Sequence, residues 1–145
     1  MGGDKMVDKE VIRKKIQELN SYLREIEKFK AISWEDFSSS LSKQWMVSHG
    51  LQLSIQTSLD IGSHILAALG ETQIEDYADI IDKLGEKEII PPEFAKSIRG
   101  MAGLRNILVH EYAKLDLKKI YDILQNRLGD FYSFIEYINK FLENG

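Results

Sequence analysis

The chain has 145 residues, which fits one domain, and a domain of this size buries about 68–70% of its unfolded surface without needing metals or disulfides. Its 43% hydrophobic and 29% charged residues, with only two prolines, exclude a disordered or collagen-like chain. The net charge of −4 argues against a surface that coats long stretches of nucleic acid, and the lack of cysteine excludes disulfides, Cys-based zinc sites and thiol catalysis.

The chain carries no apolar run that approaches the roughly 18 residues needed to span a bilayer. The longest clean run is Ile65–Leu69, and charged residues interrupt the N-terminus where a secretory signal would be apolar. We therefore expect no membrane partner and a cytoplasmic protein. We also expect a single domain over residues 6–145, with residues 1–5 as a frayed start.

Apolar residues recur at intervals of three and four from the first helix onward, which is the period of an amphipathic helix. The first stripe runs from Ile12 to Ile26, and Asp8 is a suitable N-cap for it. A polar break begins at Ser33. The second helix is predicted from about Leu41 to Leu69, is apolar over more than half of its circumference, and stops at Gly70.

The second half of the chain predicts three further helices. A short one covers Ile74–Leu84, and Pro91-Pro92 opens a fourth because proline fits the first helical turn. The last starts after Asp116 and keeps its spacing for about 27 residues, or ~40 Å, which suits packing along a whole bundle or on a second subunit. The predicted fold is an all-α, up-and-down bundle of about five helices.

Arg105 interrupts the apolar stripe of the fourth helix, since it lies only about 20° from Phe94 on a helical wheel. Burying an unpaired guanidinium costs several kcal/mol. Arg105 therefore needs a partner, a hydrated interface or a function. A simpler alternative is that its side chain reaches solvent or pairs with an acidic residue.

His110 follows five residues later, about 140° around a continuous helix from Arg105. The two share a site only if the helix ends or distorts near Val109, or if a second chain contributes. A histidine in the last turn is also favoured simply by the helix dipole.

Two further features bear on a possible site. Residues 94–119 carry six basic and two acidic side chains, a net +4 that leaves −8 for the rest, and such a zone suits a phosphate-bearing ligand, although ordinary variation in surface charge gives the same count. Asp60 and His64 lie one turn apart on a side of the second helix that also carries His49 and Gln56. Two interpretations are open. Asp60 and His64 either line a cleft, with Asp60 pairing with Arg105, or belong to a solvated polar face.

The segment Arg105–Tyr112 reads Arg, four residues, His, any residue, Tyr. It resembles the motif of HEPN domains, specifically the HepT-like toxin family of HepT/MntA-type toxin–antitoxin systems. Asn106 also matches, and the segment around Asp60 and His64 looks like the family's Asp-Ile-x-x-His-Ile sequence. The order of helices fits as well, so the resemblance covers most of the chain.

The resemblance implies an α-helical homodimer, formed through helices, with the motifs of both chains facing one cleft. It implies the toxin of a type VII-like system: a metal-independent endoribonuclease that needs no cofactor. Its partners would be RNA and a minimal nucleotidyltransferase antitoxin that transfers AMP to Tyr112, with no DNA partner expected.

The residues suit that chemistry. Metal-free RNA cleavage through the 2′-hydroxyl needs a base, an acid and a cation for the charged phosphorus centre. His110 is expected to transfer protons and Arg105 to bind phosphate, with Asn106 orienting either. One histidine does not easily serve both sides of one phosphorus, so a complete site is expected between two subunits.

Other interpretations stay open. Tyr112 also fits a packed tyrosine with a hydrogen-bonded hydroxyl. The rival function is a non-catalytic helical dimer that binds a nucleotidyltransferase partner or its nucleotide. A third possibility is a degenerate dimer whose motif is only structural.

Overall fold

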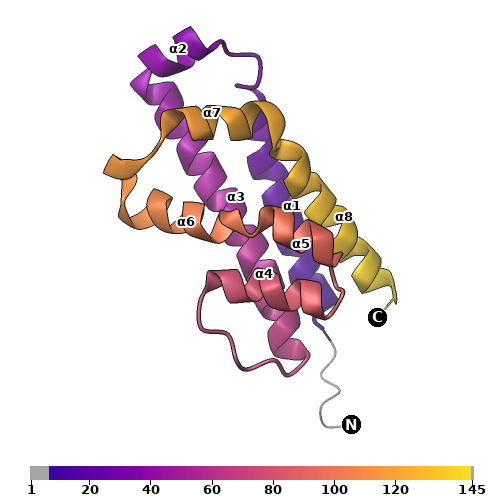
Figure 1. Ribbon diagram of the computed structural model, residues 1–145. Helices are drawn as coiled ribbons and strands as arrows, with labels where there is room; N and C mark the ends of the chain where they lie inside the picture. Colours follow the sequence, from indigo (N-terminus) through magenta and orange to yellow (C-terminus); the bar gives the residue numbers. More distant parts are fainter. Residues whose placement is uncertain (1–6, 145) are drawn as a thin grey trace.

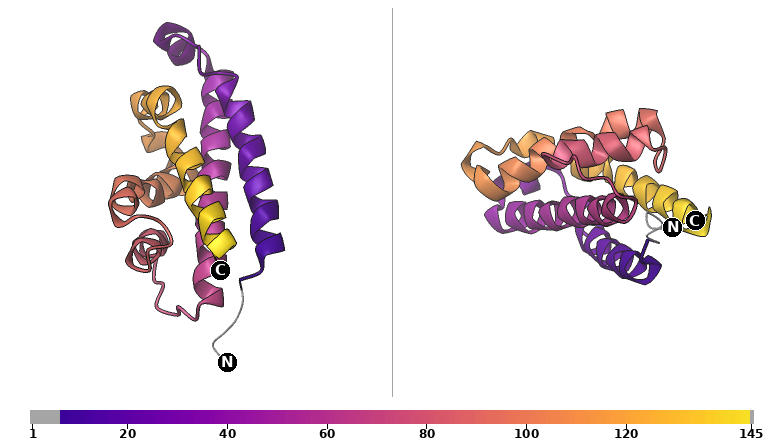
Figure 2. Two further views of the ribbon diagram at one scale, coloured as in Figure 1. Left: turned by 90° about the vertical axis from the view of Figure 1, so that its right-hand side faces the viewer. Right: turned by 90° about the horizontal axis from the view of Figure 1, so that it is seen from below.

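The computed structural model describes residues 7–144, and every regular element in that range is a helix. Helices α1 (Lys9–Glu27) and α3 (Leu41–Ala68) form a long, closely packed pair, joined through the short α2 (Trp34–Ser39). Helix α8 (Leu128–Asn144) lies along this pair (Figures 1 and 2). The all-α prediction is confirmed, whereas the expectation for residues 1–5 lies outside the described residues.

The remaining helices cross the α3 face of this pair. Helices α4 (Tyr77–Glu86), α6 (Gly100–His110) and α7 (Leu117–Asn126) each contact α3 and lie across it one above another in Figure 1. Helix α5 (Pro92–Ile98) leads into α6, and the short 3-10 helix η1 (Tyr112–Lys114) leads towards α7. Helix α3 is therefore central, which explains why its sequence is apolar over more than half of its circumference.

Local sequence signals set several helix ends. The side chain of Asp8 accepts a hydrogen bond from the Val11 amide and caps α1, and Asp76 caps α4 in the same way. Gly70 has φ +83°, the left-handed conformation that favours glycine after a helix. The predicted start and end of α3 and the predicted cap of α1 are confirmed.

Three predictions of helix extent are wrong. The fourth helix divides at Arg99 into α5 and α6, and the expected last helix divides at Arg127 into α7 and α8. Arg127 leaves helical geometry at φ −123°, and its side chain bonds to Asp130 Oδ2 (2.7 Å) and to the Ser97 carbonyl (3.1 Å). The polar break after Ser33 contains α2. A one-residue corner leaves the three–four spacing intact on both sides, so the pattern does not reveal it.

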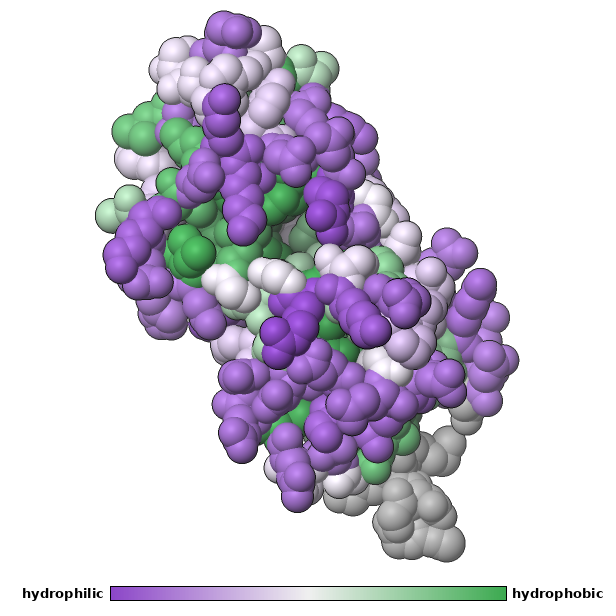
Figure 3. All heavy atoms as spheres, in the orientation of Figure 1, coloured by the Kyte–Doolittle hydropathy of each residue, from purple (hydrophilic) through white to green (hydrophobic). Residues whose placement is uncertain are grey.

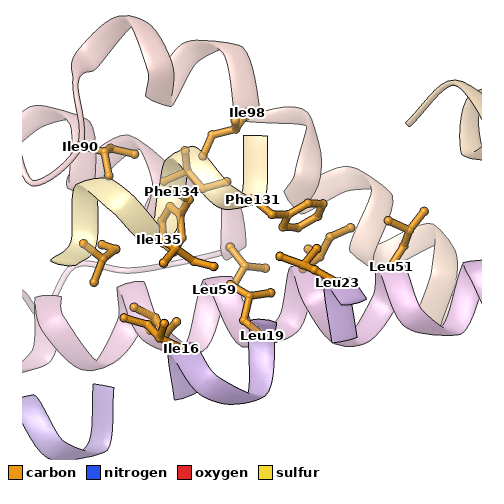
Figure 4. Packing of buried hydrophobic residues seen from close by; sticks show 14 of the residues in the cluster. Ile16, Leu19, Leu23, Leu51, Leu59, Ile90, Ile98, Phe131, Phe134 and Ile135 are labelled. Carbon is orange, nitrogen blue, oxygen red and sulfur yellow. The ribbon is translucent and has the colours of Figure 1, made fainter. Parts of the chain in front are cut away.

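The core lies where α1, α3 and α8 meet and extends under α4, α5 and α6 (Figure 4). Each buried side chain of this type stabilises the fold by about 1.5–3 kcal/mol. Figure 4 labels ten of its members, namely Ile16, Leu19, Leu23, Leu51, Leu59, Ile90, Ile98, Phe131, Phe134 and Ile135.

Gly62 marks the closest approach of α3 and α4. A Cβ atom placed there would lie 2.8 Å from Ile80 Cγ2 and 2.9 Å from Leu84 Cδ1, closer than real contacts allow. Any larger residue would therefore force the side chains of Ile80 and Leu84, or α4 itself, to shift. Within residues 7–144, no helix combines the length and apolar content that a bilayer crossing requires.

Candidate functional site

The motif occupies the second half of α6 and the turn that follows it. Helix α6 continues to His110, and Glu111 ends it by adopting φ −137° and ψ 41°. Arg105 is half-buried on the helix, His110 is exposed at its last position, and Tyr112 opens η1 with 39% of its surface exposed. The three motif residues are thus close in sequence but have three different surroundings.

The guanidinium of Arg105 is held on three sides. Its Nε donates to Oε1 of Gln56 at 2.8 Å, and its Nη1 donates to Oδ1 of Asn106 at 3.2 Å. Its central carbon lies 4.4 Å from the centroid of the Tyr77 ring, which is a cation–π contact. A guanidinium has five N–H donors. Contacts within residues 7–144 use two of them, so three are free to bind an anion.

Gln56 connects Arg105 to Asp60. Its Nε2 donates to Oδ1 of Asp60 at 3.0 Å, while its Oε1 accepts from Arg105. The expected pairing of Asp60 with Arg105 is therefore indirect, and no carboxylate among the described residues forms an ion pair with the guanidinium. The side of α3 that carries Asp60 was predicted, but the contacting residue is Gln56.

The two other histidines lie on α3 and both are exposed. Neither His49 nor His64 forms a hydrogen bond or ion pair with the motif within the part of the chain that is described. The role of His64 in lining a cleft stays a prediction. Across residues 7–144, no group of three or more histidine or carboxylate side chains is placed to hold a metal ion.

Arg105 and His110 lie on different faces of α6. Because the helix is regular between them, their side chains are about 140° apart around its axis. The distortion near Val109 that would have brought them together is absent from this segment. Asn106 is exposed and bonds to Arg105, so it belongs to the arginine side of the site.

A hollow of about 370 Å³ opens between the start of α4 and α6. Tyr77 and Asn106, two of the three residues that hold Arg105, both line it. Gly103 also lines it, and a Cβ atom at that position would meet nothing within 4 Å. The surface beside the guanidinium contacts is therefore open enough to receive part of a substrate.

Apolar surface gathers near the motif. Figure 3 shows a hydrophobic hollow between α6 and α7, framed by hydrophilic side chains, and Met101, Leu104 and Ile123 are among the residues that line a cavity there. Larger exposed apolar side chains lie on the first turns of α3, namely Leu41, Trp45 and Met46, and at the end of the motif, namely Val109 and Tyr112. Figure 1 places the start of α3 and the end of α6 on the same side of the molecule.

The basic zone of residues 94–119 is partly neutralised by its own neighbours. Arg99 pairs with Asp82, whose hydrogen bond is the main cause that raises the pKa of the guanidinium, and Lys114 pairs with Glu111 at 3.2 Å. Arg105 differs from these two cations because its partner is the neutral amide of Gln56. Among the cations of this zone, it is the one that hydrogen bonds hold in place without an ion pair to a carboxylate of residues 7–144.

Comparisons with known proteins identify the family of the chain. A model of the HepT-like ribonuclease family matches residues 19–138, a span that holds the motif and every contact of Arg105 described above. The chain belongs to the HepT-like family. The resemblance carried by the motif is thereby confirmed.

Two relatives of this HepT-like chain have named activities. It is 33% identical over 132 residues to the tRNA nuclease HepT of Aphanizomenon flos-aquae, covering 91% of this chain and 90% of that protein. It is 29% identical over 102 residues to the mRNA nuclease HepT of Shewanella oneidensis, covering 70% of this chain and 77% of the relative.

Solved structures show the same fold. A toxin–antitoxin crystal structure with AMP-PNP matches with a TM-score of 0.83 at 25% identity, covering 90% of this chain and 98% of that one. The tri-AMPylated HEPN toxin of Shewanella oneidensis, in complex with MNT antitoxin, matches with a TM-score of 0.82 at 27% identity, covering 93% and 99%.

Proposed function

We propose that the chain is the toxin of a toxin–antitoxin system and that it cleaves RNA as a metal-independent endoribonuclease. The observation that carries this proposal is Arg105, whose guanidinium is oriented on three sides and paired with no carboxylate of residues 7–144. Its free N–H donors match the oxygens of a phosphodiester. Membership of a ribonuclease family and relatives named as tRNA and mRNA nucleases support RNA as the substrate.

The proposed reaction uses the 2′-hydroxyl of RNA as the nucleophile. A base removes its proton, the oxygen attacks the adjacent phosphorus, the bond from phosphorus to the 5′-oxygen breaks, and an acid protonates that leaving oxygen. His110 supplies the proton transfers and Arg105 stabilises the charge at phosphorus, which is worth about 3–4 kcal/mol for a well-placed donor. Asn106 holds Arg105 and orients the phosphate. The products are a 2′,3′-cyclic phosphate and a 5′-hydroxyl.

The complete site is proposed to lie between two copies of the chain. Arg105 and His110 of one chain lie on different faces of α6, and one His110 cannot stand on both sides of the phosphorus. A second copy supplies the missing groups. The exposed Trp45 and Met46 in the first turns of α3 and the exposed Val109 near the end of α6 provide the apolar contact.

Subunit mixing tests the shared site. Wild-type protein is mixed with increasing amounts of the His110→Ala variant and left until the subunits have exchanged. RNA cleavage is then measured at constant total protein. If one cleft needs His110 from both subunits, activity follows the square of the wild-type fraction. A linear dependence would show that a cleft does not need His110 from both subunits.

The antitoxin is proposed to be a minimal nucleotidyltransferase that transfers AMP from ATP to the hydroxyl of Tyr112, releasing pyrophosphate. The exposure of Tyr112 makes its hydroxyl reachable. An AMP group there would block RNA by its bulk and by placing a phosphodiester beside the motif. A related toxin solved in its AMPylated form with its MNT antitoxin supports this step.

Intact mass after incubation with the antitoxin and ATP tests the modification. Wild-type protein should gain the mass of AMP and lose ribonuclease activity, and Tyr112→Phe should do neither. Tyr77→Phe is the control, because Tyr77 is half-buried beneath Arg105. If the Tyr112→Phe variant still gains the mass of one AMP group, Tyr112 is not the target.

Cleavage itself tests the main proposal. Purified wild-type protein should cut RNA in the presence of EDTA, and Arg105→Ala and His110→Ala should lose most of that activity. A protein that binds the nucleotidyltransferase or its nucleotide but leaves every RNA intact would instead support the non-catalytic alternative.

A further inference from the structure

One residue outside the motif makes a direct contact with its arginine. We propose that Gln56 is a positioning residue, which holds the guanidinium of Arg105 in the orientation that receives the scissile phosphate. The two residues are 49 positions apart in sequence and are joined by the 2.8 Å bond from Nε to Oε1. The inference rests on the proposed function, because it takes a phosphodiester as the ligand of Arg105.

The chemistry of the contact explains why an amide stands at position 56. An arginine only donates hydrogen bonds and an ionised carboxylate only accepts them. The amide of Gln56 offers its oxygen to Arg105 and its nitrogen to Asp60, so both ends are satisfied at once. Since neither neighbour tolerates the opposite arrangement, the amide is fixed in one orientation. Asp60 thus supports Arg105 without touching it.

Two contacts together determine how the guanidinium lies. The ring of Tyr77 lies against the guanidinium and limits its position, and the bond from Nε to Gln56 limits its rotation. Both hydrogens of Nη2 are left without a partner among the described residues. An arginine fixed in this way binds phosphate without first losing side-chain freedom, which is how preorganised groups favour a transition state.

The surroundings of the contact favour its persistence. Gln56, Asp60 and Arg105 are all half-buried, and their two bonds are shielded in part from solvent. Water competes less well for hydrogen bonds in such a place. The partner of Arg105 is also neutral, so no negative charge offsets the attraction of the guanidinium for a phosphate. Arg99, in contrast, forms an ion pair with Asp82.

Steady-state kinetics of RNA cleavage tests the role. Gln56→Leu removes one hydrogen bond to a charged group, and we expect about a tenfold loss in kcat/KM, mostly in kcat. Gln56→Glu keeps an oxygen that accepts from Nε, but it cannot donate to Asp60 and it pairs Arg105 with a charge, so it should lose activity as well. Gln125→Leu is the matched control, since it removes a hydrogen bond of 2.7 Å from a side-chain amide to the Lys30 carbonyl that involves no motif residue, and it should leave kcat unchanged.

A double-mutant cycle separates positioning from a general structural effect. In an Arg105→Ala background, Gln56→Leu should cause no further loss of cleavage, or of binding to a fluorescein-labelled single-stranded RNA measured by anisotropy. Additive losses, or a Gln56→Leu variant as active as wild type, would overturn the inference while leaving the proposed ribonuclease intact. An Arg105→Ala variant as active as wild type would overturn both.

Discussion

Replacing Trp45 by serine should weaken the proposed dimer strongly. Trp45 lies near the start of α3 with 56% of its surface exposed, beside Met46 at 57% and Leu41 at 56%. Aromatic side chains bury about 150–250 Å² when covered, so the exposed half corresponds to about 100 Å². At about 25 cal/mol per Å², this amounts to ~2.5 kcal/mol per copy and ~5 kcal/mol for two copies.

Buried area converts only partly into affinity, so we expect the dimer Kd to rise at least about a hundredfold. Sedimentation equilibrium over a range of concentrations measures the Kd, and RNA cleavage at the same concentrations should fall as the protein dissociates. Leu69→Ser is the control, because Leu69 is also exposed (41%) but lies at the other end of α3. An unchanged Kd for Trp45→Ser, or an equal effect of Leu69→Ser, would refute this interface.

Three further substitutions test the fold and the site. Gly62→Ala should destabilise the protein by about 1–3 kcal/mol through overpacking of α3 on α4, lowering Tm on the order of 5 °C in a circular dichroism melt. Burial, followed by the hydrogen bond to Glu27, raises the pKa of the Tyr132 hydroxyl above its ordinary value, so this hydrogen bond stabilises the fold below the ordinary pKa and is lost as the pH rises through the folded-state pKa. The Tm advantage of wild type over Tyr132→Phe should therefore be present at pH 8 and vanish as the pH rises through the folded-state pKa, and a constant difference would contradict it. Tyr77→Leu should lower the affinity for RNA severalfold by removing the cation–π contact with Arg105, whereas Tyr77→Phe should not.

The helix boundaries that the sequence predicts well are those fixed by local chemistry. Asp8 and Gly70 act within a turn of their own positions, so cap and stop are visible in the sequence. The corner at Arg127 depends on a bond to the Ser97 carbonyl, 30 residues away. A contact of that kind is tertiary, and it leaves no trace in the apolar spacing.

In the site, too, some features follow from the local sequence and others depend on tertiary contacts. Arg105 is conspicuous in the sequence because a cation at an apolar position needs a partner, and the structure gives it one. The partner could not be chosen from the sequence, because Gln56 and Asp60 lie on the same side of α3 and a carboxylate is the more usual neighbour of arginine. The separation of Arg105 and His110 around α6 followed from helical geometry, since α6 is regular between them.

The central claim is that Arg105 and His110 cleave RNA through its 2′-hydroxyl, without a metal. Mass spectrometry of RNA ends after digestion in EDTA tests it most directly. We predict 2′,3′-cyclic phosphate and 5′-hydroxyl ends from the wild type, no cut at 2′-deoxy positions, and no such products from Arg105→Ala or His110→Ala. Cleavage that persists at 2′-deoxy positions, or that both variants retain in full, would contradict the account.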